Sequence, residues 1–330
     1  MKKNYVAYSV MVILFLLGAF MPVILKSYQM NMLTEIIIFT LYAVSYNLLL
    51  GYAGLLSFGH AMFFGLGAFV TAIAINHIPG ISLINAVLFG LAATIVAGFI
   101  IGCLLLRHKG SYFALLTLAF NSLFFVVATK WSSVTGGDDG LSITRPDLNL
   151  GFTSISMTNA NHFYYVALIV VGIALVFCWY FTQTAMGKSV VLMRENEERM
   201  KFLGYNTNAS RLILFTFTGA LAGLAGCLYA LHFQFVSLSA ISVDMTTAVL
   251  IMAFVGGTGT YWGPILGVFV YILLQNFLSD ITDRWAFFMG LIFIFMVIFI
   301  PGGLSQVIMN LYQRFFGKKT DDNTEVEETT

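Results

Sequence analysis

Charge is what this chain has least of. Asp, Glu, Lys and Arg together make up 9% of its 330 residues, whereas a typical soluble domain carries about 25%. Hydrophobic residues reach 59%, and the mean hydropathy is +0.89. A chain so poor in charge cannot cover a water-facing surface, so we expect most of it to lie in a lipid bilayer. No nucleic-acid partner is expected.

Cysteine is also scarce. The three cysteines, Cys103, Cys178 and Cys227, fall inside apolar runs and lie far apart in the sequence. They lack the close spacing of a metal site, so we expect buried, unreactive thiols. The sequence therefore predicts neither a metal site nor a cofactor.

Catalytic motifs are missing as well. Neither His-Glu-x-x-His nor Gly-x-Ser-x-Gly occurs, and no pair of carboxylates stands in the middle of an apolar run. Gly187-Lys188-Ser189 resembles the end of a phosphate-binding loop, but that loop needs a glycine five residues earlier, where Thr182 stands. We therefore expect no catalytic residue and no nucleotide hydrolysis by this chain itself.

Long apolar runs dominate what is present. A helix of about 20 apolar residues crosses a bilayer, and continuous runs argue against a β-barrel, which needs short alternating segments. We predict an all-α polytopic membrane protein whose ten spans lie near 6–25, 32–50, 55–75, 82–106, 112–130, 162–182, 211–233, 243–258, 263–279 and 285–301. The first run could be a cleavable signal peptide, but no convincing cleavage site follows it before Pro22, which favours an uncleaved helix.

The distribution of Lys and Arg orients these spans. With a cytoplasmic N-terminus, twelve of the sixteen Lys and Arg residues fall on the inner side and four on the outer side. The positive-inside rule then predicts that both termini are cytoplasmic. The four outer residues are Lys26, Lys130, Arg145 and Arg284.

One charged segment, residues 184–208, interrupts the apolar runs. Within it, Glu195 precedes Arg199 and Glu197 precedes Lys201 by four residues, the order that favours an exposed helix. Gly204 predicts the end of that helix. An amphipathic helix held between two spans implies a docking partner outside this chain, although its charges could also form a merely solvated face.

Glycine is dense in two apolar stretches. In lipid, glycine allows helices to pack closely, or allows a helix to break where protein encloses the backbone. We predict an irregular, buried hinge near the cytoplasmic side of a pore, with plain helix packing as an equal alternative. The candidate pathway and hinge residues are Gly51, Gly54, Ser57, Gly59 and His60 in the first stretch and Gly256, Gly257 and Gly259 in the second. A histidine such as His60 is, taken alone, more often a packing residue than a ligand.

A further candidate face lies in the predicted span 112–130. Ala114, Thr117 and Asn121 follow one another at i, i+3 and i+7, so they stack on one side of a helix. Polar residues at such positions either bond neighbouring helices, the more usual role, or face a water-filled route. Thr117 and Asn121 join the pathway candidates on this basis.

The predicted domain organisation is simple. Residues 1–316 form the transmembrane domain, with 131–161 as an external loop and 184–208 as a cytoplasmic segment. Residues 317–330 are a polar, acidic tail that we expect to be disordered. The external TGGDDG (Thr135–Gly140) could be a calcium-binding turn, but it lacks alternating Asp ligands, so contact with an external protein is favoured.

Six segments in series resemble the signature blocks of the LivH/LivM permeases, the membrane subunits of ABC importers for branched-chain amino acids. The segments are GYAGLLSFGHAMFFGLGAF, SYFALLTLAF, TGGDDGL, MGKSVVLMRENEERMKFLGYN, GALAGLAGCLYA and VGGTGTYWGPILG. They stand in the family's order and cover nearly the whole chain, and TGGDDGL is similar to the LivM branch. In that family the Arg-Glu-Asn-Glu segment serves as the coupling helix, which enters a cleft of the ATPase subunit. The resemblance places coupling residues at Gly187, Arg194, Glu195, Asn196, Glu197, Arg199 and Gly204.

The resemblance implies a transport subunit rather than an enzyme. Separate ABC ATPase subunits would drive it, and an extracytoplasmic binding protein would supply branched-chain or related neutral amino acids. A LivH-like second permease subunit, or a second copy of this chain, would complete the route through the bacterial cytoplasmic (inner) membrane. A urea or short-amide permease is the nearest alternative. A stand-alone secondary transporter is less favoured, because no ionisable residue stands convincingly at mid-membrane.

Overall fold

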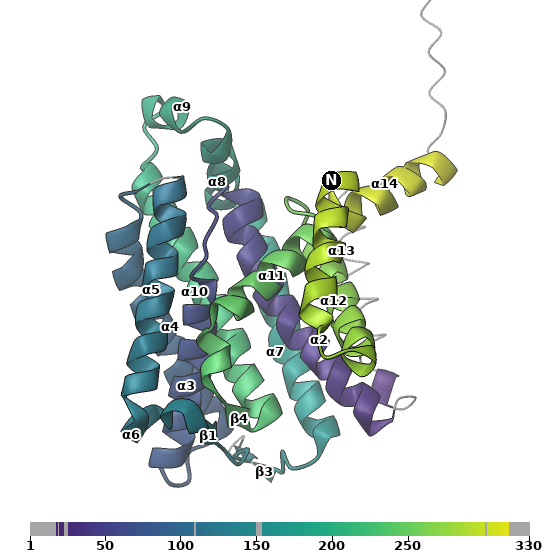
Figure 1. The fold of residues 1–330 in the computed structure, drawn as a ribbon. Helices are drawn as coiled ribbons and strands as arrows, with labels where there is room; N and C mark the ends of the chain where they lie inside the picture. The colour runs from purple at the N-terminus through teal and green to yellow at the C-terminus, as the bar shows by residue number, and fades with distance from the viewer. Residues whose placement is uncertain are drawn as a thin grey trace, which may run out of the picture.

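The protein is a bundle of long, mostly apolar helices that run between two ends (Figure 1). The computed structural model describes residues 18, 20–22, 26–108, 110–149, 154–300 and 302–316. The predicted tail, 317–330, and most of the predicted first span, 6–25, lie outside the described residues. The prediction of an all-α polytopic membrane protein is confirmed.

Each of the nine predicted spans after the first corresponds to a helix. They are α2 (Ser27–Asn47), which continues as the π-helical turn η1 (Leu48–Tyr52), α3 (His60–His77), α4 (Leu83–Leu105), α5 (Ser111–Lys130), α7 (Ala160–Gln183), α10 (Thr207–Phe233), α11 (Val243–Gly256), α12 (Gly263–Ile281) and α13 (Trp285–Phe299). Seven of these segments are long and apolar enough to cross a bilayer, judged by length and composition. Helices α11 and α13 are shorter, so the count of ten spans stays a prediction.

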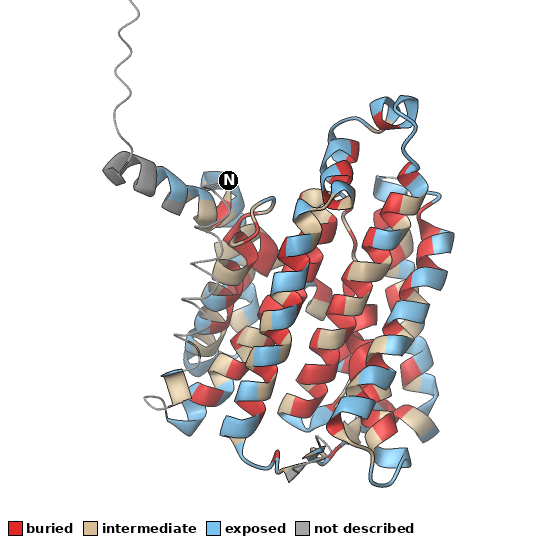
Figure 2. Ribbon diagram, turned by 180° about the vertical axis from the view of Figure 1, so that it is seen from behind, coloured by how far each residue is buried: buried red, intermediate tan, exposed pale blue. Residues whose placement is uncertain are grey.

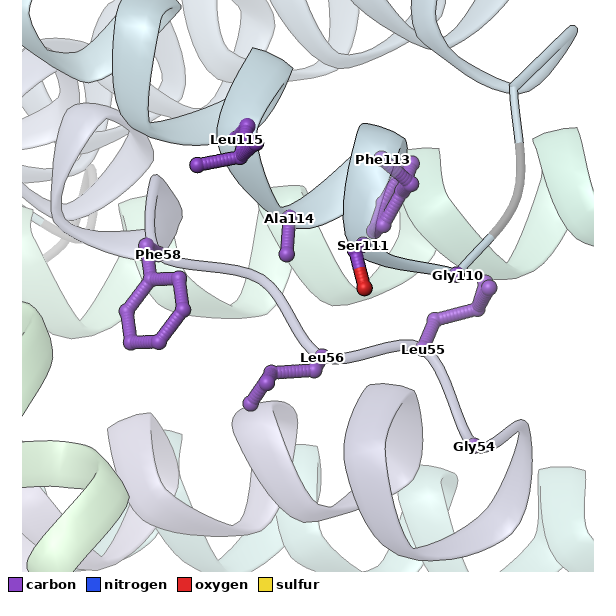
Figure 3. A pocket seen from close by; sticks show the side chains of 9 residues that line it. All are labelled: Gly54, Leu55, Leu56, Phe58, Gly110, Ser111, Phe113, Ala114 and Leu115. Carbon is purple, nitrogen blue, oxygen red and sulfur yellow. The ribbon is translucent and has the colours of Figure 1, made fainter.

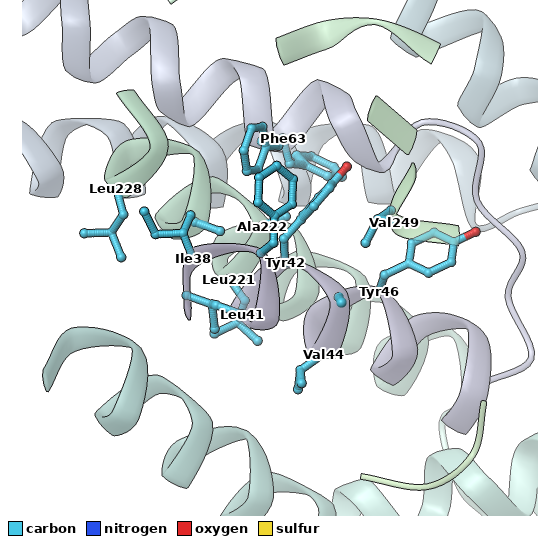
Figure 4. Close-up of a cluster of buried hydrophobic side chains, with 14 of the residues drawn as sticks. Ile38, Leu41, Tyr42, Val44, Tyr46, Phe63, Leu221, Ala222, Leu228 and Val249 are labelled. Atoms are coloured by element: carbon cyan, nitrogen blue, oxygen red, sulfur yellow. The ribbon is translucent and has the colours of Figure 1, made fainter. Parts of the chain in front are cut away.

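Helix α2 lies at the centre of the bundle. Most of its length is apolar on every side, and a helix of that kind is stable only when it is surrounded by protein or lipid. Its Leu41, Tyr42 and Tyr46 are fully buried, in a cluster that includes side chains of α10 and α11 (Figure 4). The helix packs against α7, α10, α11 and α12. Buried residues gather on these inner helices, and exposed ones on the outer faces (Figure 2). Helix α2 therefore joins the two halves of the chain.

Helices α3, α4 and α10 pack closely because small residues face one another. A side chain at Gly67 of α3 would collide with the backbone of Gly223 in α10, and one at Gly226 would collide with the Phe64 carbonyl. Gly223 also lies against Thr94 of α4. Helix association in lipid depends on such close van der Waals contact, since lipid tails are as apolar as the side chains.

The loop between α5 and α7 is folded against the end of α10. It contains α6 (Ser132–Thr135), the 3₁₀ turn η2 (Gly137–Asp139) and the two-residue strands β1 (Leu141–Ser142), β2 (Leu148–Asn149) and β3 (Ser154–Ile155). Strand β2 pairs with β3, and β1 pairs with β4 (Phe235–Val236), which follows α10. Arg145 donates hydrogen bonds of 2.5 Å to the carbonyls of Leu231 and His232. This places a cation at the C-terminus of α10, where the helix dipole favours it, although burial lowers the pKa of the Arg145 guanidinium.

The predicted external loop and cytoplasmic segment lie at opposite ends of the bundle (Figure 1). This arrangement agrees with opposite membrane sides for residues 131–161 and 184–208, whereas the cytoplasmic position of both termini stays a prediction. The expectation of three buried thiols was wrong for Cys103, which is exposed on α4. The exposed neighbours of Cys103 on that helix, such as Phe99 and Leu104, are apolar, as suits a surface that faces lipid.

Replacing Gly226 by valine should destabilise the bundle. The new side chain would overlap the Phe64 carbonyl, which cannot yield without moving α3, and overpacking of this kind costs roughly 1–3 kcal/mol. Thermal unfolding in detergent, followed by fluorescence-detected size exclusion, measures the effect. Gly290→Val in α13, where an added Cβ meets open space, is the control. Equal midpoints for the two variants would contradict the prediction.

Candidate functional site

The charged segment between α7 and α10 forms two short helices rather than the single helix expected. Helix α8 spans Ala185–Glu195 and α9 spans Glu197–Phe202. Asn196 separates them at φ −155°, and its side-chain oxygen accepts a hydrogen bond of 2.9 Å from the Arg199 N–H as the N-cap of α9. The expected helical pair of Glu195 and Arg199 is therefore wrong, because the two residues lie on different helices.

The two ends of the segment are capped. At the start of α8 the Thr184 hydroxyl accepts a hydrogen bond of 3.2 Å from the Gly187 N–H, and Gly187 lies too close to the end of α7 for a side chain. At the other end Gly204 has φ +82°. The N–H groups of Gly204 and the next residue return to the carbonyls of Lys201 and Met200 at 3.0 and 3.1 Å, which is a Schellman motif. The predicted stop at Gly204 is confirmed.

Glu197 fastens the segment to the bundle. Its carboxylate lies 2.5 Å from the Arg211 guanidinium of α10 and 3.1 Å from the Lys201 ammonium, the latter an i,i+4 pair that the sequence predicts. Thr207 also donates a hydrogen bond to it at 3.4 Å. The side chains of Glu197 and Arg211 are only 14% and 10% exposed. Glu197 therefore faces its own chain rather than a partner.

The outward surface of the segment is apolar as well as charged. Phe202 is 91% exposed and Leu203 66% exposed, and Tyr205 beside them is half-exposed. Glu195 and Arg199 are also exposed. Large apolar side chains gathered beyond the ends of the spans, and rimmed by charges, are typical of a protein interaction surface.

Arg194 connects the segment to the first glycine-rich stretch. Its Nη1 donates a hydrogen bond to the carbonyl of Gly51 in η1. Its methylene groups lie against Gly54, where an added Cβ would stand 3.1 Å from the Arg194 Cγ. Gly54 also has φ +69°, a conformation that favours glycine. The charged segment and the candidate hinge are thus in direct contact.

The first glycine-rich stretch contains an irregular break. The chain leaves η1, runs without helix over residues 53–59 and enters α3. The Phe58 N–H donates to the Thr117 hydroxyl at 3.1 Å, and the Ala61 N–H donates to the Thr246 hydroxyl at 3.1 Å. Irregular backbone survives in a bilayer only where protein or enclosed water satisfies it. Here α5 supplies a partner to the break, and α11 supplies one to the first turn of α3 that follows it. The function of this break as a hinge stays a prediction.

His60 is completely buried at the start of α3. Its Nε2 lies 2.9 Å from the Ser45 hydroxyl of α2, and its ring stacks on Tyr42 with 5.6 Å between ring centroids. Its Nδ1 has no hydrogen-bond partner among the described residues. These contacts give His60 a packing role between α2 and α3.

Thr117 and Asn121 face the same region from α5. Gly59 lies against the Thr117 backbone too closely for any side chain. The Asn121 Nδ2 donates a hydrogen bond of 2.8 Å to the Ile241 carbonyl in the 3₁₀ turn η3 (Leu238–Ile241). Asn121 therefore bonds neighbouring elements, the alternative role that the sequence left open, and its place in a pathway stays a prediction.

The second glycine-rich stretch turns the chain between α11 and α12. Gly257 and Gly259 have φ +109° and +91°, and Gly256 lies against the backbone of α12 too closely for a side chain. The Gly259 N–H donates to the Asn47 Oδ1 at 3.2 Å, while the Asn47 Nδ2 donates to the Thr260 carbonyl at 2.9 Å. Sequence reasoning missed Asn47, whose one signal is an amide within an apolar run.

A cavity of about 450 Å³ lies between the first break and the start of α5 (Figure 3). Leu55, Leu56 and Phe58 line one wall, and Ala114 and Leu115 belong to the other. Small-molecule pockets measure about 300–1,000 Å³, so the cavity can hold one small, largely apolar group. Within the described residues no cluster of three His, Cys, Asp or Glu side chains could bind a metal.

This architecture is that of a multi-pass helical membrane protein in which a charged segment outside the bundle contacts a broken helix inside it. Residues 28–299 match the model of the family described as the branched-chain amino acid transport system permease component. The chain belongs to that family.

Relatives of known name agree with this assignment. The high-affinity branched-chain amino acid transport system permease protein LivM of Escherichia coli is 27% identical over 89% of this chain and 74% of its own length. A probable LivM of Methanocaldococcus jannaschii is 25% identical over 76% of this chain and 81% of its own length. An autoinducer 2 import system permease protein LsrC of Enterobacter is 26% identical over 74% of this chain and 70% of its own length. No solved structure matches the chain significantly.

Neutralising Glu197 should loosen α9 from α10. Glu197→Gln removes a charged hydrogen-bond acceptor and leaves Arg211 less well paired in a mostly buried place, a loss of roughly 1.5–3 kcal/mol. Limited proteolysis of the segment in detergent measures the loosening, and faster cleavage is expected. Glu198→Gln, an exposed change on the same turn, is the matched control. Equal cleavage rates for the two variants would show that the ion pair does not hold the segment.

Proposed function

We propose that this chain is the membrane-spanning permease subunit of an ABC importer that moves branched-chain or related neutral amino acids inward. Family membership and the LivM relatives support the proposal. The observation that carries it is the exposed apolar surface of the charged segment, joined through Arg194 to the break that lines the cavity. Through this contact, a partner bound to the segment could act on the route.

The partners follow from this proposal. Separate ABC ATPase subunits hydrolyse ATP and bind the charged segment. A second permease subunit, LivH-like or a copy of this chain, completes the route, and an extracytoplasmic binding protein delivers the substrate in the bacterial cytoplasmic membrane. In this assembly the chain has no catalytic residue of its own.

The residues of the segment divide into three groups. Glu195, Arg199 and Phe202 point outward and contact the ATPase subunit. Gly187, Asn196 and Gly204 set the shape of the segment through the caps and turns described above. Arg194 and Glu197 fix it to the bundle. The docking helix expected from the sequence is thus α8 together with α9.

The cavity beside the first break is part of the substrate route in this proposal. Its walls are largely aliphatic and aromatic side chains, which suit the side chain of leucine, isoleucine or valine. The names of the LivM relatives favour branched-chain amino acids over urea or a short amide.

A charge in the exposed apolar surface should weaken ATPase binding. Phe202→Asp removes a 91% exposed aromatic ring, and such residues at interface centres contribute enough for a loss of at least about tenfold in affinity. Co-purification and titration of the ATPase subunit measure the loss. Tyr28→Asp is the control, because Tyr28 is 67% exposed and lies at the N-terminal end of α2. Unchanged ATPase binding by the Phe202 variant would mean that the docking surface lies elsewhere.

Filling the cavity should block large substrates first. Ala114→Phe narrows a wall beside Leu56 and Phe58, and we expect leucine uptake to fall roughly tenfold or more, with a smaller effect on alanine. ATP-dependent uptake of radiolabelled amino acids into proteoliposomes, with urea as a comparison substrate, measures this. Val126→Phe, exposed on the same helix, is the control. An equal loss of leucine and alanine uptake in the Ala114 variant would show that the cavity is not part of the substrate route. Uptake of urea instead of leucine by the unsubstituted transporter would overturn the assigned substrate.

A further inference from the structure

Three segments that lie far apart in the sequence meet at Gly51. Arg194 of the charged segment donates to its carbonyl. An added Cβ there would collide with the Asn47 side chain and stand 2.7 Å from the Gly259 N–H nitrogen. The absence of a side chain at Gly51 therefore allows the second glycine-rich turn to lie against η1. Arg194 bonds to the same residue of η1.

Asn47 makes this approach specific. Its amide donates to the Thr260 carbonyl at 2.9 Å and accepts from the Gly259 N–H at 3.2 Å. The side chain is 1% exposed, so water cannot replace these two bonds. Backbone groups of an irregular turn inside the membrane need such partners, and Asn47 supplies both a donor and an acceptor to the same turn.

We propose that Asn47 is a positioning residue for transport, which joins the two glycine-rich breaks so that they move together when the charged segment moves. This inference rests on the proposed function. The connection from the charged segment to the second glycine-rich turn consists of two hydrogen bonds. The first joins Arg194 to Gly51 on η1, and the second joins Asn47, one turn earlier on the same helix, to Gly259. A partner that pulls the segment thereby acts on the first half of the chain through α3 and on the second half through α12.

The same turn is also tied to the C-terminal helix. The Thr260 hydroxyl donates to the Ser305 hydroxyl at 3.1 Å, near the start of α14 (Gly303–Phe316). The backbone of Gly257 lies so near Gly303 that a side chain at Gly303 would clash with it. Through Asn47, the influence of the charged segment reaches α14 as well.

Hydrogen exchange on the purified permease tests the connection without any transport assay. Among the described residues Arg194 makes no hydrogen bond to residues 256–262. Arg194→Gln should nevertheless raise amide exchange there by at least about twofold, the low end for coupling through packed side chains. In an Asn47→Leu background the same Arg194 substitution should cause no further increase in amide exchange over residues 256–262. Unchanged exchange over 256–262 in Arg194→Gln, or the same increment in both backgrounds, would overturn the proposal. The Arg194 variant alone gives an answer if Asn47→Leu does not fold.

Uptake by the assembled transporter tests the consequence. Asn47→Leu should lower ATP-dependent leucine uptake at least about tenfold while ATPase binding and hydrolysis persist, so that fewer molecules enter per ATP. Asn276→Leu is the matched control, because within the described part of the chain the Asn276 amide bonds only to Ile272 of the same helix, at 3.0 Å. Uptake by this variant should stay at the wild-type level. A wild-type ratio of uptake to hydrolysis in Asn47→Leu would refute the positioning role. Absence of leucine uptake in the wild type would instead refute the proposed function and leave the exchange result standing.

Discussion

Inside a bilayer every backbone N–H and C=O needs a partner within the protein, because lipid supplies none. The long helices meet this requirement by themselves, but the two glycine-rich breaks do not. The Thr117 hydroxyl accepts from the Phe58 N–H of the first break, and the Thr246 hydroxyl accepts from the Ala61 N–H just after it. Arg194 donates to the Gly51 carbonyl just before it. Asn47 covers the second break. The need to satisfy two short irregular segments thus explains where these four polar side chains lie and which elements they join.

The same requirement explains why glycine occurs where it does. At Gly59 and Gly256 the backbone of another element passes where a side chain would stand, and at Gly54 and Gly257 the dihedral angles favour glycine. Close approach and unusual conformation coincide at these breaks. In α3 and α10, by contrast, glycine serves only close packing of regular helices. Irregular backbone and close helix packing therefore both occur, each in a different part of the molecule, and the function of the break as a hinge stays a prediction.

Hydropathy and spacing were enough to predict the helical class, the approximate bounds of nine spans and the stop at Gly204, because each depends on nearby residues alone. The division of the charged segment at Asn196 was missed, although an Asn that can cap a following helix is a local signal. Other features depend on residues brought together by folding. The pairing of Glu197 with Arg211, the bonds of Asn47 and the exposure of Cys103 cannot be seen in sequence order, since no periodicity relates a side chain to a partner on a distant helix.

The charged segment combines two kinds of surface that are separate in space. Its inward groups, Arg194 and Glu197, bond to the chain itself, which keeps the segment in one position before any partner arrives. Its outward apolar groups, Phe202 and Leu203, remain in water, where burying each would contribute about 1.5–3 kcal/mol. Affinity for a partner can then come from apolar contact, while the exposed charges set its orientation. Because the position is fixed in advance, little of that binding energy is spent on ordering the segment, and under the proposed function more is left to move the break beside Arg194.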